Sequence, residues 1–176
     1  MRLLDGIYSS PGQLLEKACH DKAILLRSLE CGDELLLREA LFNFCVTNYH
    51  IWDWVKAYRD DLRQPVASLL DGSEALRACR DLCNASKHVK LSLQSRAYRD
   101  HPPVIEEVTM SALGAATPAG IDEFLGSLPE NENSPLPAPP WRLKVQLKSG
   151  GRVPMEQLAE EVVQTWRRFF KDHEVS

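Results

Sequence analysis

Hydrophobic residues recur at the helical period through the first part of the chain. Over residues 11–31, leucines and alanines return every three or four positions, and Ser10-Pro11 provides an N-cap followed by a proline at the first helical position. A glycine then interrupts the pattern, and Asp33 is placed to cap a second helix. That helix is predicted over about 34–58, because no glycine or proline falls inside it.

The pattern weakens over residues 59–73 and then returns. This mixed stretch of polar and apolar residues contains Pro65 and is closed by Asp71-Gly72, and no helix is predicted in it. A third helix, capped by Ser73, is predicted from Glu74 to about His88 or Val89. Its core-facing side is predicted to hold Leu76, Cys79, Leu82, Cys83 and Ser86.

The second half of the chain has a different character. Residues 101–140 hold eight of the chain's 11 prolines, and we expect an irregular excursion there, apart from a short strand over 104–110. Polar and apolar residues alternate over 141–148, as in a half-buried strand. After a Ser-Gly-Gly turn, a last helix is predicted from Met155 to about Phe170.

These elements predict a mainly α protein. It is a helical bundle of three to four main helices, with a small β element (strands near 104–110 and 141–148) before the C-terminal helix. A length of 176 residues is typical of one domain. In that domain, residues 1–90 form the bundle core, 101–140 the proline-rich excursion, and 141–176 the strand, turn and helix that complete the fold.

Composition narrows the class of protein. Hydrophobic residues make up 44% and charged residues 26%, with a net charge of −4, which excludes a globally basic nucleic-acid binder but not a local basic face. No segment approaches the roughly 18 to 20 apolar residues of a membrane span, and the first residues lack a secretory signal. The five cysteines include no CxxC pair and no second pair for zinc. We therefore expect a cytoplasmic protein with reduced thiols and no cofactor.

The second predicted helix carries apolar residues on more than one side. One stripe contains Leu37, Leu41, Phe44, Asn48, Ile51 and Val55, and the opposite side contains Phe42, Val46 and Tyr49 beside His50 and Asp53. A helix that is apolar on both sides is normally buried on both. This helix is therefore either central in the bundle or part of a dimer interface. In both cases Tyr49, His50 and Asp53 lie on a partly buried contact face.

The third predicted helix carries a basic stripe opposite its apolar side. The stripe contains Arg77, Arg80, Asn84, Lys87 and His88. The spacing of Arg80, Asn84 and His88 keeps them on one helix face. Such a face binds phosphate oxygens, with Arg77, Arg80 and Lys87 as candidate RNA contacts. His88 is a candidate proton donor or acceptor near neutral pH.

A structural interpretation fits the same residues, because most ion-pair networks are structural. In that interpretation Asp53 pairs with Lys87 or His88 and sets the register of two helices. His50 and Asp53 bond to one another, and Asn84 or His88 caps the end of the third helix. The protein is then a non-catalytic helical binding or regulatory module.

A metal site is a third interpretation. His50, Asp53 and His88 provide two imidazoles and one carboxylate, which is a known ligand set on bundle helices. The neighbouring cation Lys87 opposes a bound metal, and no fourth ligand is evident. We therefore expect no metal.

Two segments carry a resemblance to known proteins. Tyr49-His50-Ile51-Trp52-Asp53-Trp54, followed by Asn84-Ala85-Ser86-Lys87-His88, resembles a group of small uncharacterised bacterial helical proteins with a YHxxDW helix and a later NxxKH helix. These proteins also tend to carry a C-terminal strand and a helix that contains tryptophan, as Trp166 does here. The group is similar in turn to the HEPN superfamily of helical, RNA-directed domains.

The HEPN-like resemblance implies a four-helix arrangement, a homodimer and metal-independent cleavage of RNA. Many such domains act in toxin–antitoxin or phage-defence systems, so the implied partners are RNA, an antitoxin or other system component, and no membrane. The superfamily's nuclease motif separates an arginine from a histidine by four to six residues. Here Arg80 and His88 have seven residues between them, whereas Arg96 and His101 have four but are followed by two prolines.

The resemblance also implies roles for the candidate residues. His88 acts as acid or base, while Arg80 and Lys87 stabilise phosphoryl charge in the transition state. Asn84 orients a reacting group. His50 and Asp53 support His88 or complete a composite site across a dimer.

Overall fold

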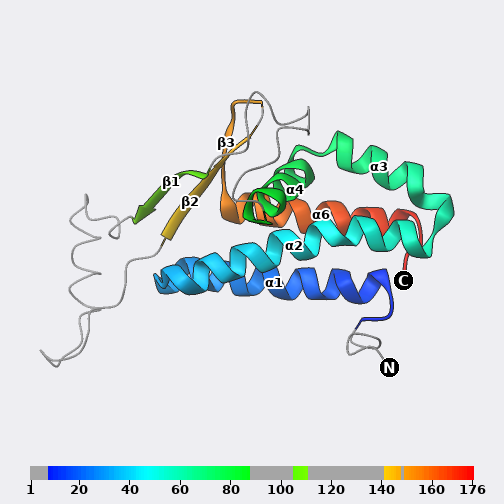
Figure 1. The fold of residues 1–176 in the computed structure, drawn as a ribbon, viewed down its shortest axis with the longest axis horizontal. Helices are drawn as coiled ribbons and strands as arrows, with labels where there is room; N and C mark the ends of the chain where they lie inside the picture. Colours follow the sequence, from blue (N-terminus) through cyan, green and yellow to red (C-terminus); the bar gives the residue numbers. More distant parts are fainter. Residues whose placement is uncertain (1–7, 88–104, 111–140, 148) are drawn as a thin grey trace, which may run out of the picture.

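Five α-helices and a three-stranded sheet make up the part of the chain that the structure describes (Figure 1). This computed structural model describes residues 8–87, 105–110, 141–147 and 149–176. The helices are α1 (Pro11–Cys31), α2 (Glu34–Tyr58), α3 (Arg63–Gly72), α4 (Glu74–Lys87) and α6 (Met155–Asp172). The strands are β1 (Ile105–Met110), β2 (Trp141–Gln146) and β3 (Arg152–Pro154). The predicted mainly α bundle with a small β element before the C-terminal helix is confirmed.

The α1–α2 hairpin forms where the sequence predicts it. Ser10 Oγ accepts a hydrogen bond from the backbone N–H of Gln13, and Asp33 accepts one from Leu36 at 3.0 Å, so both predicted caps are present. Gly32 lies between the helices with a φ of 70°, a left-handed conformation that favours glycine. The two helices run antiparallel and side by side (Figure 1). The C-terminal helix α6 also packs against α1.

The mixed stretch over residues 59–73 contains a short helix that the sequence analysis did not predict. A 3-10 turn spans Asp60–Leu62 and α3 follows directly, in addition to the four predicted main helices α1, α2, α4 and α6. Pro65 does not break α3 because it lies in the first turn, where a backbone N–H needs no intrahelical partner. Val66 and Leu70 are the buried residues of this helix and form the side that faces the core.

The predicted apolar side of α4 is confirmed for the described side chains. Leu76, Cys79, Leu82 and Cys83 are buried, whereas the side chain of Ser86 lies outside the described residues. Ser73 caps the helix by accepting a hydrogen bond from the backbone N–H of Leu76 at 3.2 Å.

The sheet has the order β1-β2-β3, with both pairs antiparallel. Both predicted strands are present, and the alternation is confirmed in β2, where Leu143 and Val145 are buried while Arg142 and Lys144 are exposed. The sequence analysis missed β3, because three residues ending in a proline show no alternation. Apart from β1, the predicted proline-rich excursion lies outside the described residues.

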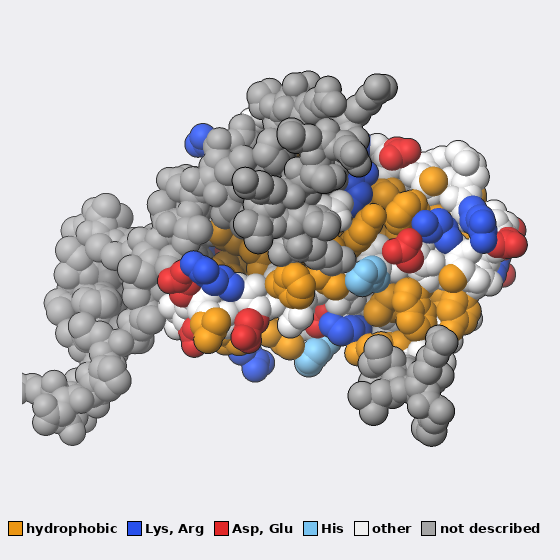
Figure 2. Space-filling view, viewed as in Figure 1, with side chains coloured by type: hydrophobic (Ala, Val, Ile, Leu, Met, Phe, Trp, Pro, Cys, Tyr) orange, Lys and Arg blue, Asp and Glu red, His pale blue; other side chains and the backbone are white. Residues whose placement is uncertain are grey.

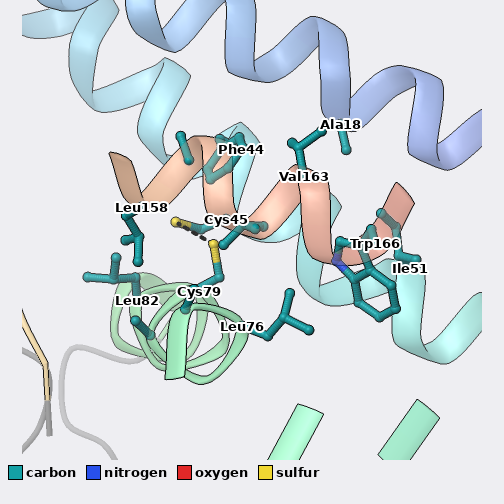
Figure 3. Packing of buried hydrophobic residues seen from close by; sticks show 14 of the residues in the cluster. Ala18, Phe44, Cys45, Ile51, Leu76, Cys79, Leu82, Leu158, Val163 and Trp166 are labelled. Atoms are coloured by element: carbon teal, nitrogen blue, oxygen red, sulfur yellow. Dashed lines mark hydrogen bonds between the residues drawn. The ribbon is translucent and has the colours of Figure 1, made fainter. Parts of the chain in front are cut away.

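The core joins the helices and β2 into one hydrophobic cluster. Phe44 and Ile51 of α2 are fully buried against it, together with Trp166 of α6, whose ring meets Phe169 and Phe170 edge-on. Figure 3 shows Cys45 of α2 and Cys79 of α4 pointing toward one another within this cluster. Among the described helices, none combines the length and apolar character that a membrane crossing requires.

Candidate functional site at the contact of α2 and α4

The helices that carry the two motifs contact one another. Cys45 Sγ on α2 and Cys79 Sγ on α4 lie 4.0 Å apart, and both thiols are buried. The hydrogen bond with Cys79, and then burial, raise the pKa of the Cys45 thiol well above its usual value. This contact therefore keeps Cys45 protonated, which makes it a packing element and a poor nucleophile.

On α2, the YHxxDW segment presents a series of stacked rings. The Tyr49 ring stacks on His50 and on Trp52, with centroids 6.2 and 5.8 Å apart. Tyr49 and His50 are partly buried, as predicted, and both take part in further interactions. His50 is thus held in place by its neighbours, which is a requirement for a positioned acid or base.

Asp53 lies at the surface of α2, with its side chain 50% exposed. Its carboxylate pairs with Lys56 at 3.1 Å, and the Lys56 ammonium lies 3.2 Å from the centroid of the Trp52 ring. The prediction that Asp53 lies in a buried network is therefore wrong, whereas its predicted pairing with Lys87 or His88 involves side chains outside the described residues. The i, i+3 spacing provides Asp53 with a cation on its own helix.

On α4, the predicted basic stripe is partly exposed and its arginines are anchored. Arg77 donates a hydrogen bond to the backbone carbonyl of Asp71, and Arg80 Nε donates to Asp81 Oδ1 at 2.9 Å. Asn84 is partly buried and also has a partner. The last two members of the stripe are the Lys87 side chain and His88, which lie outside the described residues.

The sequence analysis missed Asp81, whose side chain is 1% exposed. By the helical period this residue points away from Cys79, so α4 is covered on more than one side. A buried carboxylate needs a charged partner, and Arg80 provides one. Asp81 therefore fixes the guanidinium of a candidate site residue. No pattern in the sequence signals this burial.

A second buried ionic cluster, also missed, joins α1 to α2. Lys17 Nζ donates to Asp21 Oδ2 at 2.5 Å and to Thr47 Oγ1 at 2.8 Å, and the Thr47 hydroxyl donates to Asp21 at 2.5 Å. The i, i+4 spacing of Lys17 and Asp21 indicates an ion pair in the sequence, but nothing there indicates Thr47. The ammonium of Lys17, the hydroxyl of Thr47 and Oδ2 of Asp21 all take part in this cluster, which helps to hold the hairpin together.

Among the described residues, no three or more His, Cys, Asp or Glu side chains lie close enough together to bind a metal ion. The predicted ligand set needs His88, which lies outside the described residues. Two surface grooves, of about 510 and 550 Å³, lie beside α6 and contain none of the predicted site residues. One borders β2 and β3, and the other borders α1.

Comparisons of the chain with models of protein families, with curated proteins and with solved structures found no match. The function is therefore argued from the residues of α2 and α4.

Proposed function

We propose that this protein is an HEPN-like, RNA-directed protein of a bacterial defence or toxin–antitoxin system, and that it cleaves RNA without a metal. One observation carries the proposal. The helix with the YHxxDW segment contacts the helix with the NxxKH segment, and α4 buries its apolar side while keeping its arginines partly accessible. The aromatic and imidazole side chains of α2 and the arginines of α4 thus belong to two helices that contact one another.

The proposed chemistry is proton transfer combined with charge stabilisation. A base takes the proton of the ribose 2′-hydroxyl, the 2′-oxygen attacks the adjacent phosphorus, and an acid protonates the leaving 5′-oxygen. His88 is the proposed acid or base, with His50 as its support or counterpart. Arg80 and Lys87 stabilise the negative charge on phosphorus, and Arg77 binds the RNA backbone. Asp81 holds the Arg80 guanidinium at 2.9 Å and so positions it.

The test is the integrity of a mixed RNA substrate incubated with wild-type protein, with and without EDTA. We expect cleavage in both buffers, and a loss of roughly 10²- to 10⁴-fold in His88→Ala. Arg63→Ala is the matched control, because Arg63 is a 65% exposed cation in the first turn of α3, outside the two helices that carry the proposed site, and its removal should leave the rate unchanged. Intact RNA at high protein concentration contradicts the proposal, and so does cleavage that EDTA abolishes.

A non-catalytic binding module is the second candidate. It is favoured by the pairing of Asp53 with Lys56 and of Arg80 with Asp81, because both charges are balanced within their own helices. This candidate predicts that a labelled RNA or an antitoxin-like partner protein binds without turnover. RNA affinity measured by fluorescence anisotropy then falls with salt, and the bound RNA stays intact.

The proposal includes a homodimer. A second copy provides the composite arrangement in which His50 and Asp53 complete a site, and α2 has exposed apolar side chains through which two copies can meet.

A further inference from the structure

The outer side of α2 carries a seven-residue repeat. Its positions, called the α2 seam below, are separated alternately by four and three residues: Leu35, Glu39, Phe42, Val46, Tyr49, Asp53 and Lys56. None of the seven is fully buried, and Leu35 and Phe42 are 67% and 43% exposed. In Figure 2, hydrophobic side chains alternate with charged and histidine side chains along the band that α1 and α2 occupy in Figure 1. A mean spacing of 3.5 residues is typical of a helix face that packs along another helix.

We propose that the α2 seam packs against the α2 seam of a second copy of this chain, antiparallel, about a two-fold axis near Cys45 and Val46. This inference specifies the contact of the homodimer in the proposed function and rests on that part of it. A two-fold axis perpendicular to a helix brings each residue opposite a partner with the same sum of residue numbers. With the axis between residues 45 and 46, Phe42 faces Tyr49 of the second copy and Leu35 faces the alkyl stem of its Lys56.

Charge selects the antiparallel arrangement. In a parallel pair each seam charge meets its own copy, so Glu39, Asp53 and Lys56 all face like charges. In the antiparallel pair Arg38, beside the seam and 75% exposed, faces Asp53 of the second copy. Glu39 then lies within about one helical turn of the second copy's Lys56. The Arg38–Glu34 pair opens at little cost because both side chains are solvent-exposed. The Lys56–Asp53 pair need not open, because Lys56 contacts Asp53 Oδ1 and the second carboxylate oxygen can accept Arg38 of the second copy.

The size of the contact sets the expected affinity. With 25 residues, α2 is about 37 Å long, so one helix face provides an interface at the small end of specific complexes. For so small an interface we expect weak association, with a dissociation constant in the micromolar range. The same geometry brings Arg38 of the second copy to Asp53, next to His50, so each site then contains a cation from the other copy.

The first test is the molar mass of the full chain by sedimentation equilibrium from about 1 to 500 µM, a range set by the micromolar expectation. The mass is expected to rise from 19.9 kDa toward twice that value. Phe42→Asp should raise the dissociation constant by at least about 30-fold. Tyr58→Asp is the matched control, because Tyr58 is 55% exposed on α2 but lies off the seam. A wild-type mass of 19.9 kDa throughout overturns the proposal, and so does a dimer that Phe42→Asp leaves intact.

A charge swap tests the antiparallel register. Arg38→Asp and Asp53→Arg should each weaken the dimer by about 5-fold or more, and the double variant should restore it. Both side chains are exposed, so neither change threatens the fold. A double variant as weak as the singles overturns the register. The molar mass is measured without RNA, so the two proposals can fail separately. A monomer that cleaves RNA refutes the α2 seam contact alone. A seam-dependent dimer that leaves RNA intact refutes the proposed nuclease activity alone.

Discussion

The Lys17–Asp21–Thr47 cluster makes Lys17→Met the most informative stability test. The methionine keeps most of the side-chain volume but removes the ammonium that Asp21 and Thr47 share. The Asp21 side chain is 6% exposed, so its carboxylate remains buried with the Thr47 hydroxyl alone. Removing one partner of a buried pair costs about 3 to 5 kcal/mol. Lys17 is 29% exposed and partly hydrated, so we expect a loss below that range, about 2 to 3 kcal/mol.

For a chain of 176 residues this loss corresponds to a fall in Tm of about 5 to 10 °C. The assay is thermal unfolding followed by circular dichroism at pH 7, supported by urea titration for the free energy of unfolding. Arg38→Met is the control, because its pair with Glu34 is exposed and its loss costs less than about 0.5 kcal/mol. Adding Asp21→Asn to Lys17→Met removes the uncompensated charge and should recover about half of the loss.

Two results refute this reasoning. If Lys17→Met lowers Tm no more than Arg38→Met does, the carboxylate of Asp21 does not depend on the ammonium. If Asp21→Asn fails to recover stability in the Lys17→Met background, the loss comes from packing of the Lys17 stem and not from an unpaired charge.

Three further predictions concern other elements. A thiol reagent should label exposed Cys31 and partly buried Cys19 in the native protein, and buried Cys45, Cys79 and Cys83 only in denaturant; rapid native labelling of more than two thiols contradicts the described core. The hydrogen bond that Ser149 N–H donates to Glu74 at 2.9 Å lowers the pKa of Glu74 below its ordinary 4.5. Its stabilisation is present above pH 4.5 and lost as pH falls through the lowered value. The Tm difference between wild type and Glu74→Ala should therefore shrink below pH 4.5, and a constant difference from pH 3 to 7 would exclude this role. Asn48→Leu should leave Tm within about 3 °C of wild type or raise it, because Asn48 Oδ1 is buried without a hydrogen-bond partner; a fall of more than about 8 °C shows that the amide is needed.

The boundaries of the first two helices could be predicted because their signals are local. The caps at Ser10 and Asp33 bond to backbone groups three residues away, and Gly32 adopts its left-handed conformation within the same turn. The helix α3 escaped prediction because Pro65 is a breaker in a helix interior but not in a first turn. In the sequence, a proline in a first turn looks the same as a proline in a helix interior, and the two cases can be told apart only when the start of the helix is known.

The candidate site could be predicted in part. The apolar side of α4 followed from the helical period, and Leu76 and Cys79 are buried as expected. The exposure of Asp53 and the burial of Asp81 could not be predicted in this way, because each depends on what packs against its helix. The Asp53–Lys56 pair was readable from its i, i+3 spacing.

By itself, the sequence determined where α1 and α2 begin and end, which helix faces are apolar and which residues carry charge. Only the tertiary structure decided which faces meet. Thr47 reaches Asp21 across 26 positions, Cys79 meets Cys45 across 34, and Ser149 meets Glu74 across 75. The hydrophobic effect is non-directional, so an apolar stripe shows that a helix face is buried but not against which neighbour. Hydrogen bonds between distant residues form only after that choice has brought donor and acceptor within bonding distance of one another.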